Sequence, residues 1–168
     1  MKIYLLFSLI SFTLFSCPYE RTYDKYSSDY EPEIMERSAF ENAIAIVNAS
    51  GTPKVKNAGK IYLKTPYMFI GDTNKGFYVY DNSEPTTPSL IAFLKIPGAT
   101  DLAIKGDVIY VNQSVDLVAF SCDFSRNKVT IHDRIRNTFP VLRSPDGYYP
   151  VISEDKVVVD WHKKSKTE

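Results

Sequence analysis

The sequence lacks an excess of charge of either sign. Its 20 lysines and arginines are balanced by 20 aspartates and glutamates, and the basic residues form no block. Proteins that bind nucleic acid neutralise phosphates with lysine and arginine, so this balance gives such a partner no electrostatic support. We therefore expect no nucleic-acid partner.

Cysteine and histidine are scarce, with two residues of each, namely Cys17, Cys122, His132 and His162. The sequence contains neither H-x-x-x-H nor G-x-S-x-G, so these signatures of zinc and hydrolase sites are missing. We expect no metal, no cofactor and no catalytic residue, and predict that the protein is not an enzyme. Cys122 is expected to be a buried, small apolar residue.

Long hydrophobic runs are missing with one exception, residues 3–15, which follow Met1 and Lys2 and end before Pro18. A helix of this length covers about 20 Å, whereas the hydrocarbon core of a bilayer is about 30 Å thick. The run is therefore too short for a permanent transmembrane helix. Its charged start and apolar centre predict an export signal over residues 1–16.

The apolar run leads into Leu14-Phe15-Ser16-Cys17, which resembles the lipobox of bacterial lipoproteins. Ser16 supplies the small residue at the scissile bond and Cys17 the thiol that is acylated, while Phe15 is bulkier than the usual residue. The resemblance implies that Cys17 is lipidated and holds the protein at the outer membrane, on its periplasmic or surface face. The alternative is an ordinary signal peptide with an incidental cysteine. If Cys17 is lipidated, Cys122 has no partner for an intramolecular disulfide.

The segment after the cysteine has no apolar period. Residues 17–33 alternate tyrosines with charges and serines, which predicts a flexible tether. Residues 34–58 form a lead-in, where Ser38 to Glu41 have the form of a capping box and predict a short helix from about Ala39. Ile44 and Ile46 could equally begin an extended segment. Residues 161–168 form a charged tail.

Residues 59–160 consist of short apolar runs separated by turn residues, in a chain rich in tyrosine and phenylalanine. This pattern predicts an all-β antiparallel domain. The expected strands are residues 61–64, 67–70, 77–80, 90–96, 102–105, 108–111, 117–120, 129–131 and 157–159.

Part of this domain is repeated. Residues 61–73 align with residues 102–114 at an offset of 41, and residues 76–81 align with residues 116–121 at an offset of 40. Apolar positions and turns coincide although identities are few. A period of this length with about four strands is the size of a β-propeller blade. The alternative is that two unrelated hairpins share a common pattern.

The first copy resembles the LVIVD-type repeat of bacterial surface proteins, through Gly76, the apolar residues 77–80 with Asp81, and then Pro85 and Pro88. The second copy keeps Asp116-Leu117-Val118 but has residues 122–126 in place of the proline turn. With the lipobox, these features are similar to the N-terminal part of propeller-type lipoproteins of the Bacteroidota. The resemblance implies antiparallel, propeller-blade-like repeats, about two in number, in an incomplete ring.

Relatives of this kind continue into further repeats, and two copies cannot close a ring. The chain is then either a truncated remnant of a longer propeller lipoprotein or an open β-sheet unit. In the second case residues 34–58 or another chain would cover it, and unpaired strand edges would favour self-association.

Several residue groups have the composition of a metal or catalytic site. Residues 72–76 have the D-x-N-x-G spacing of a calcium loop, but Lys75 places a cation inside it, which favours a hairpin turn. A hydrolase acting on glycans would need Glu154, Asp155 and His132 to converge in one pocket, or a carboxylate pair such as Asp101 and Asp107.

Tyr148 and Tyr149 lie between Asp146-Gly147 and Pro150 and are the candidate binding surface, because exposed aromatic rings serve protein and carbohydrate contacts. The alternative is that they cover the end of the sheet. The sequence therefore predicts a lipid-anchored cell-envelope protein with a non-catalytic binding or scaffolding role, whose partners are the membrane and a protein or carbohydrate. The alternative function is a periplasmic or surface hydrolase.

Overall fold

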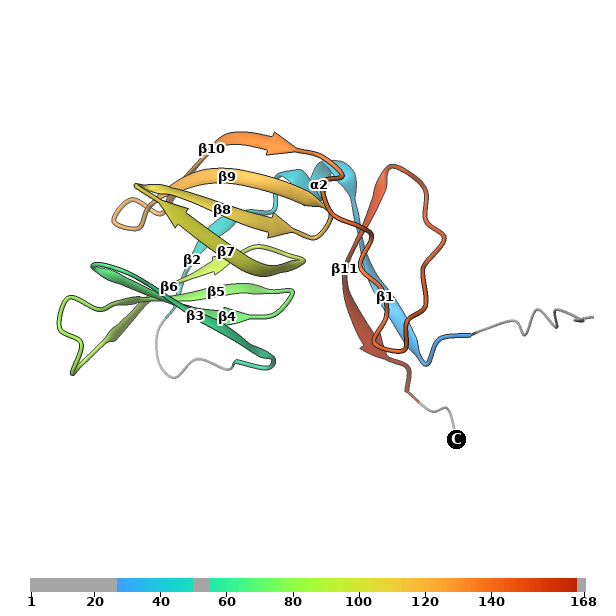
Figure 1. Cartoon of the computed structure of the whole chain (residues 1–168), viewed down its shortest axis with the longest axis horizontal. Coiled ribbons are helices and arrows are strands. Elements are labelled where there is room, and N and C mark those ends of the chain that lie inside the picture. The colour runs from blue at the N-terminus through green and yellow to red at the C-terminus, as the bar shows by residue number, and fades with distance from the viewer. Residues whose placement is uncertain (1–26, 50–54, 166–168) are drawn as a thin grey trace, which may run out of the picture.

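The computed structural model describes residues 27–49 and 55–165, and these residues form an antiparallel, all-β structure with one short helix (Figure 1). None of the described residues belongs to a helix long and apolar enough to cross a bilayer. The predicted export signal and Cys17 lie outside the described residues.

The first sheet is a meander of four strands to which a fifth is added at one edge. Its order is β2-β6-β5-β4-β3, so that β2 pairs with β6 at the outer edge. The strands are β2 (Ala45–Asn48), β3 (Ala58–Lys64), β4 (Tyr67–Asp72), β5 (Gly76–Asp81) and β6 (Ser89–Lys95). We call the meander β3–β6 blade 1.

The second sheet is a meander of the same kind, with the order β10-β9-β8-β7, and we call it blade 2. Its strands are β7 (Ala99–Lys105), β8 (Val108–Gln113), β9 (Asp116–Asp123) and β10 (Lys128–Ile135). All nine predicted strands fall on strands of the structure, with β11 (Lys156–Lys163) as the last.

The two blades share their irregularities as well as their strand order. The register of the first strand pair shifts between Ala58 and Ile61 in blade 1, and between Ala99 and Leu102, 41 residues later, in blade 2. A second bulge leaves out Ile91 in β6 and His132 in β10, again 41 residues apart. Bulges are specific features of a strand pair, so the common positions show that the repeat extends over all four strands.

The main core lies between the blades, which are stacked face to face (Figure 1). Phe69, Phe77 and Leu94 of blade 1 are at most 2% exposed, and they share one apolar cluster with Val111 and Phe120 of blade 2. The first strands β3 and β7 contact each other, as do β2 and β10 at the opposite edge. Side chains alternate across a strand, so only one face of each blade enters this core.

A third unit pairs β1 (Tyr30–Glu36) with β11 in a two-stranded antiparallel sheet, and the helix α2 (Arg37–Glu41) follows β1 directly. We call β1, α2, β11 and the chain between β10 and β11 the cap. A second apolar cluster joins the cap to blade 2, with Phe40, Val157 and Val159 packed against Val115 in the β8–β9 turn.

The region before blade 1 differs from the sequence prediction. The helix begins at Arg37, and its N-cap is Glu36, which makes no side-chain capping bond, so Ser38 lies inside the helix and the predicted capping box does not form. The predicted tether reaches residue 33, whereas β1 begins at Tyr30, because a distant strand, β11, supplies its hydrogen-bond partners. Ile46 lies in β2, as the extended alternative had it, and the predicted tail begins within β11.

The β4–β5 turn is the tightest point of blade 1. Asn74 has a positive φ of 64°, and Gly76 has a φ of 137°, a conformation that residues with a side chain rarely adopt. A Cβ added to Gly76 would lie 2.1 Å from the carbonyl oxygen of Leu94. The backbone of β6 therefore passes where a side chain at position 76 would stand.

Gly76→Ala should lower the free energy of unfolding by about 3 kcal/mol, because it adds backbone strain to a clash with β6. Chemical denaturation followed by circular dichroism measures this. Gly106→Ala is the matched control: it also has a positive φ, of 60°, but no atom lies within 4 Å of the added Cβ. It should cost about 1 kcal/mol. Equal losses in the two variants would contradict the close approach described here.

Candidate functional site

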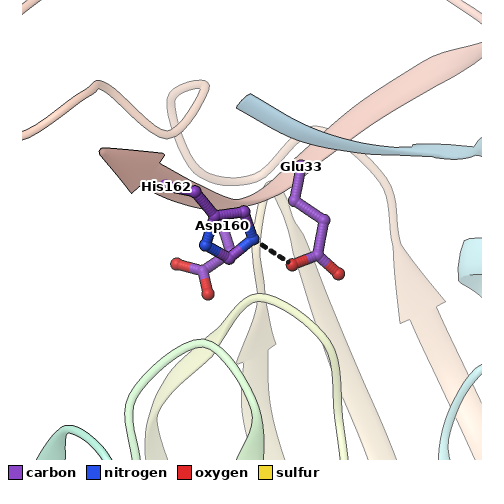
Figure 2. Close-up of side chains that lie close together, drawn as sticks. All are labelled: Glu33, Asp160 and His162. Atoms are coloured by element: carbon purple, nitrogen blue, oxygen red, sulfur yellow. Dashed lines mark hydrogen bonds and ion pairs between the residues drawn. The ribbon is translucent and has the colours of Figure 1, made fainter. Parts of the chain in front are cut away.

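A cluster of ionisable side chains lies where the cap meets blade 1. Glu33 extends from β1, and Asp160 and His162 extend from the paired strand β11, as Figure 2 shows. His162 Nε2 lies 2.9 Å from Glu33 Oε2. The side chains of Glu33 and His162 are about half exposed, whereas that of Asp160 is buried.

The β4–β5 turn supplies the opposite charge. Lys75 Nζ lies 2.9 Å from Glu33 Oε2 and 2.9 Å from Asp160 Oδ2. Next to it, Asn74 Nδ2 donates a hydrogen bond of 2.8 Å to Asp160 Oδ1. The strained turn therefore presents two donors to the carboxylates of the cap and ties the cap to blade 1.

The ion pairs shift the acidities of this cluster. The hydrogen bond from Lys75 is the largest cause that holds the pKa of Glu33 below its ordinary value. Burial of Asp160 opposes its ionisation, but the bonds from Lys75 and Asn74 outweigh burial and the pKa of Asp160 is lowered. Burial likewise opposes the charge of Lys75, yet its two carboxylate partners raise its pKa. At neutral pH all three groups are therefore charged.

Glu33, Asp160 and His162 are also the residues that could hold a metal ion, since one ligand atom from each lies within 4.8 Å of the others. The ammonium group of Lys75 already bonds to both carboxylates, in the place where a cation would neutralise them. This donor set fits an ion-pair contact between the cap and blade 1 better than a metal centre.

A second buried carboxylate joins the cap to blade 2. Asp116 is fully buried and accepts hydrogen bonds from Arg37 to both of its oxygens, at 3.0 and 2.9 Å, and from Arg134 at 2.8 Å. Burial works against its ionisation, but the backbone N–H of Asn137 and the two arginines lower its pKa. Arg37 and Arg134 also lie over the ring of Phe40, at 5.4 and 5.6 Å from its centroid.

Two grooves border the cap. One, of about 470 Å³, which we call the charged groove, is lined by Arg37, Arg136, Glu154 and Lys156 together with apolar residues such as Val115 and Val157. The other, of about 640 Å³, is more apolar and lies between β1 and residues 148–152. Its lining includes Tyr30, Pro32, Ile34, Tyr148 and Val151.

The two tyrosines predicted as a binding surface have different surroundings. Tyr148 lines the apolar groove and packs edge to face on Trp161, with ring centroids 6.4 Å apart. Tyr149 is 48% exposed and does not line the groove, and the guanidinium of Arg143 lies 4.2 Å from its ring centroid. The structure thus adds β1 and Val151, which is 96% exposed, to the surface that the sequence suggested.

His132 and Glu154, which a hydrolase would need in one pocket, lie on different parts of the molecule. His132 bonds to the Ser121 hydroxyl on blade 2, whereas Glu154 lines the charged groove, to which His132 does not contribute. Asp101 is bound by Lys60 and by the Tyr62 hydroxyl, both of blade 1. The geometry therefore does not bring Glu154 and His132 together in one pocket.

Asp107 lies in the β7–β8 turn, and Asp72 to Gly76 form the β4–β5 turn, with Asp72 accepting the backbone N–H of Asn57. Residues 72–76 therefore form the hairpin turn that the sequence predicts. Cys122, predicted to be buried, is partly buried where it pairs with Val129 and packs against the main core, and it is a free cysteine. Its burial raises the pKa of its thiol to about 12.

Lys75→Met should destabilise the protein by about 1 kcal/mol at neutral pH, because it leaves two carboxylates without their cation in a partly exposed setting. The folded pKa values of Glu33 and Asp160 are lowered, so their contribution is complete above their unfolded values of about 4.3 and 3.9. It is lost as the pH falls through the folded values.

Urea denaturation between pH 7 and pH 2.5 measures this effect, and the curves of the wild type and Lys75→Met should converge at the acid end. Lys60→Met is the control, because Lys60 forms its ion pair with Asp101 at an exposed site. Its effect should be smaller at every pH. A constant difference between wild type and Lys75→Met down to pH 2.5 would show that Lys75 acts by packing and not by charge.

Comparison with known protein families matches residues 56–93 to the LVIVD repeat. No curated protein and no solved structure matches the chain. The matched residues run from just before β3 to near the end of β6. The chain therefore carries an LVIVD repeat, and this repeat corresponds to blade 1.

Proposed function

We propose that the protein is a cell-envelope lipoprotein, anchored through Cys17 to the outer membrane, with a non-catalytic binding or scaffolding role. The lipobox-like Leu14-Phe15-Ser16-Cys17 at the end of the apolar run supports the anchor. Two or three acyl chains hold a protein at a membrane more firmly than one, since each buried CH₂ contributes about 0.8 kcal/mol. The thiol at position 17 serves attachment and takes no part in chemistry.

The apolar groove beside β1 is the observation that carries the binding role. Two of the apolar side chains that line it are exposed, Ile34 at 41% and Val151 at 96%. Exposed apolar residues beside an aromatic-lined depression are typical of protein contact surfaces. A protein segment suits this lining better than a carbohydrate, which would need an open, flat ring face, because Ile34, Val151 and Ile152 stand beside the tyrosines.

Lipidation is tested by labelling cells with an alkyne analogue of a fatty acid. The wild type and Cys122→Ala should incorporate the label and sediment with membranes, whereas Cys17→Ala should do neither. The Cys122 variant controls for acylation of a thiol elsewhere in the chain. Equal labelling of Cys17→Ala and wild type, or no label in the wild type, would refute the anchor.

The binding surface is tested by placing a photo-reactive phenylalanine analogue at Val151 and irradiating intact cells. We expect a cross-linked product larger than the chain, and its loss when Ile34→Asp is added, because that charge disrupts the apolar groove. The analogue at Lys128, an exposed site on blade 2, is the control. Equal products from positions 151 and 128 would contradict a specific surface, and a product sensitive to glycosidase would identify a carbohydrate partner.

A further inference from the structure

Blade 1 has an apolar outer face on the side away from blade 2. Cross-strand pairs point to the same side of a sheet, so the pairs Ile61–Ile70, Leu63–Met68 and Ile70–Tyr78 define this face. Val47, Ile61 and Leu63 are 45, 62 and 70% exposed. Its residues are Val47, Ile61, Leu63, Met68, Ile70, Tyr78, Tyr80, Leu90 and Phe93.

The repeat gives this face a counterpart whose environment is known. At the offsets of 41 and 40, Ile61, Leu63, Met68, Ile70, Tyr78 and Tyr80 correspond to Leu102, Ile104, Ile109, Val111, Val118 and Phe120. In blade 2 these counterparts form the face that packs on blade 1. The outer face of blade 1 thus repeats, position by position, a face that is buried against another blade.

The same correspondence identifies what such a face packs against. The blade 1 side of the core is formed by Phe69, Phe77, Val79 and Leu94, whose counterparts are Tyr110, Leu117, Ala119 and Ile135. Pairing of Leu117 with Ile135 and of Ala119 with Tyr110 places them together on the outer face of blade 2. Tyr110 is 37% and Ile135 is 54% exposed, so this face is also open among the described residues.

A shallow groove of about 530 Å³ marks the position of contact on blade 2. Tyr110, Leu117 and Phe139 line it, with Ala103. Phe139 donates its backbone N–H to Val115, as Ile96 does to Lys75 in the preceding repeat. Ile96 is fully buried in the main core, whereas Phe139 is 36% exposed. The groove on blade 2 therefore lies at the repeat positions that, in blade 1, contact the apolar side chains of blade 2.

We infer that the outer face of blade 1 docks on the outer face of blade 2 of a second copy of this chain. The contact would repeat between molecules the packing that joins the two blades within one molecule. Because the two surfaces differ, the contact is heterologous and runs head to tail. Such a contact closes into a ring when the rotation from one copy to the next divides a full turn. Rings of about four to eight blades are the usual size of a propeller. This inference does not depend on the proposed anchor or on the groove beside β1.

The test uses the full chain, extracted from cells with a non-ionic detergent and examined by sedimentation velocity at about 100 μM. The wild type should sediment as an oligomer. Ile61→Asp with Leu63→Asp should disrupt the blade 1 face, and Tyr110→Asp with Ile135→Asp the blade 2 face. Each double variant should associate at least tenfold more weakly, because a charge would be buried in an apolar contact. Lys163→Asp, at an exposed site on the cap, should behave as the wild type.

Mixing the two double variants decides between head-to-tail and symmetric association. Each retains one intact face, so an equimolar mixture should form a dimer with one copy of each and no larger species. Circular dichroism and thermal unfolding check that each variant is folded, and the exposure of the substituted side chains favours this. A monomeric wild type, loss of association from the blade 1 variant alone, or a mixture that stays monomeric would each overturn the inference.

Discussion

The structure depends on one contact, the burial of one face of each blade against the other. Each four-stranded meander exposes one face to water and buries the other in this core, to which Ile44 and Ile46 beside blade 1 also contribute. Phe69, Phe77 and Leu94 meet Val111 and Phe120 there with almost no exposure. Burying a side chain of this size contributes about 1.5–3 kcal/mol, so a few such residues exceed the net stability of many small domains.

In each blade, the turn between the second and third strands is hydrogen-bonded to the unit that follows it in the chain. Asn74 and Ser114 occupy the same repeat position, and both have a positive φ, of 64° and 46°. Gly98, at the start of blade 2, donates its N–H to Asn74 and accepts the N–H of Ser114. The Ser114 hydroxyl in turn donates to the carbonyl of Val158 in the cap. A backbone conformation that costs energy locally is thus compensated by hydrogen bonds to the next unit.

The sequence predicts the parts of the fold that depend on local pattern, and it misses those that depend on distant partners. Alternating apolar residues and turn signals place all nine predicted strands, and the repeat offsets identify the two blades. β1 was not predicted because Pro32 and three glutamates disfavour a strand, although Tyr30, Pro32 and Ile34 alternate with Glu31 and Glu33, and it becomes a strand by pairing with β11. The contact of Lys75 with Asp160 was equally hidden, since no spacing relates two residues 85 positions apart. In the candidate binding surface, Tyr148 lines the groove, whereas the contribution of Ile34 depends on that same pairing of β1.

Equivalent turn positions carry different side chains in the two blades, and these side chains hold the cap. Lys75 of blade 1 corresponds to Val115 of blade 2, and Gly76 corresponds to Asp116. Lys75 bonds to carboxylates of the cap. Val115 packs in the apolar cluster of the cap, and Asp116 accepts hydrogen bonds from Arg37 of the cap. The cap is therefore held at the same end of both blades by contacts that the repeat does not share. Because the repeated positions are used for stacking sheets, the features that the repeat does not share lie in these turns and in the cap, which the charged groove and the apolar groove border.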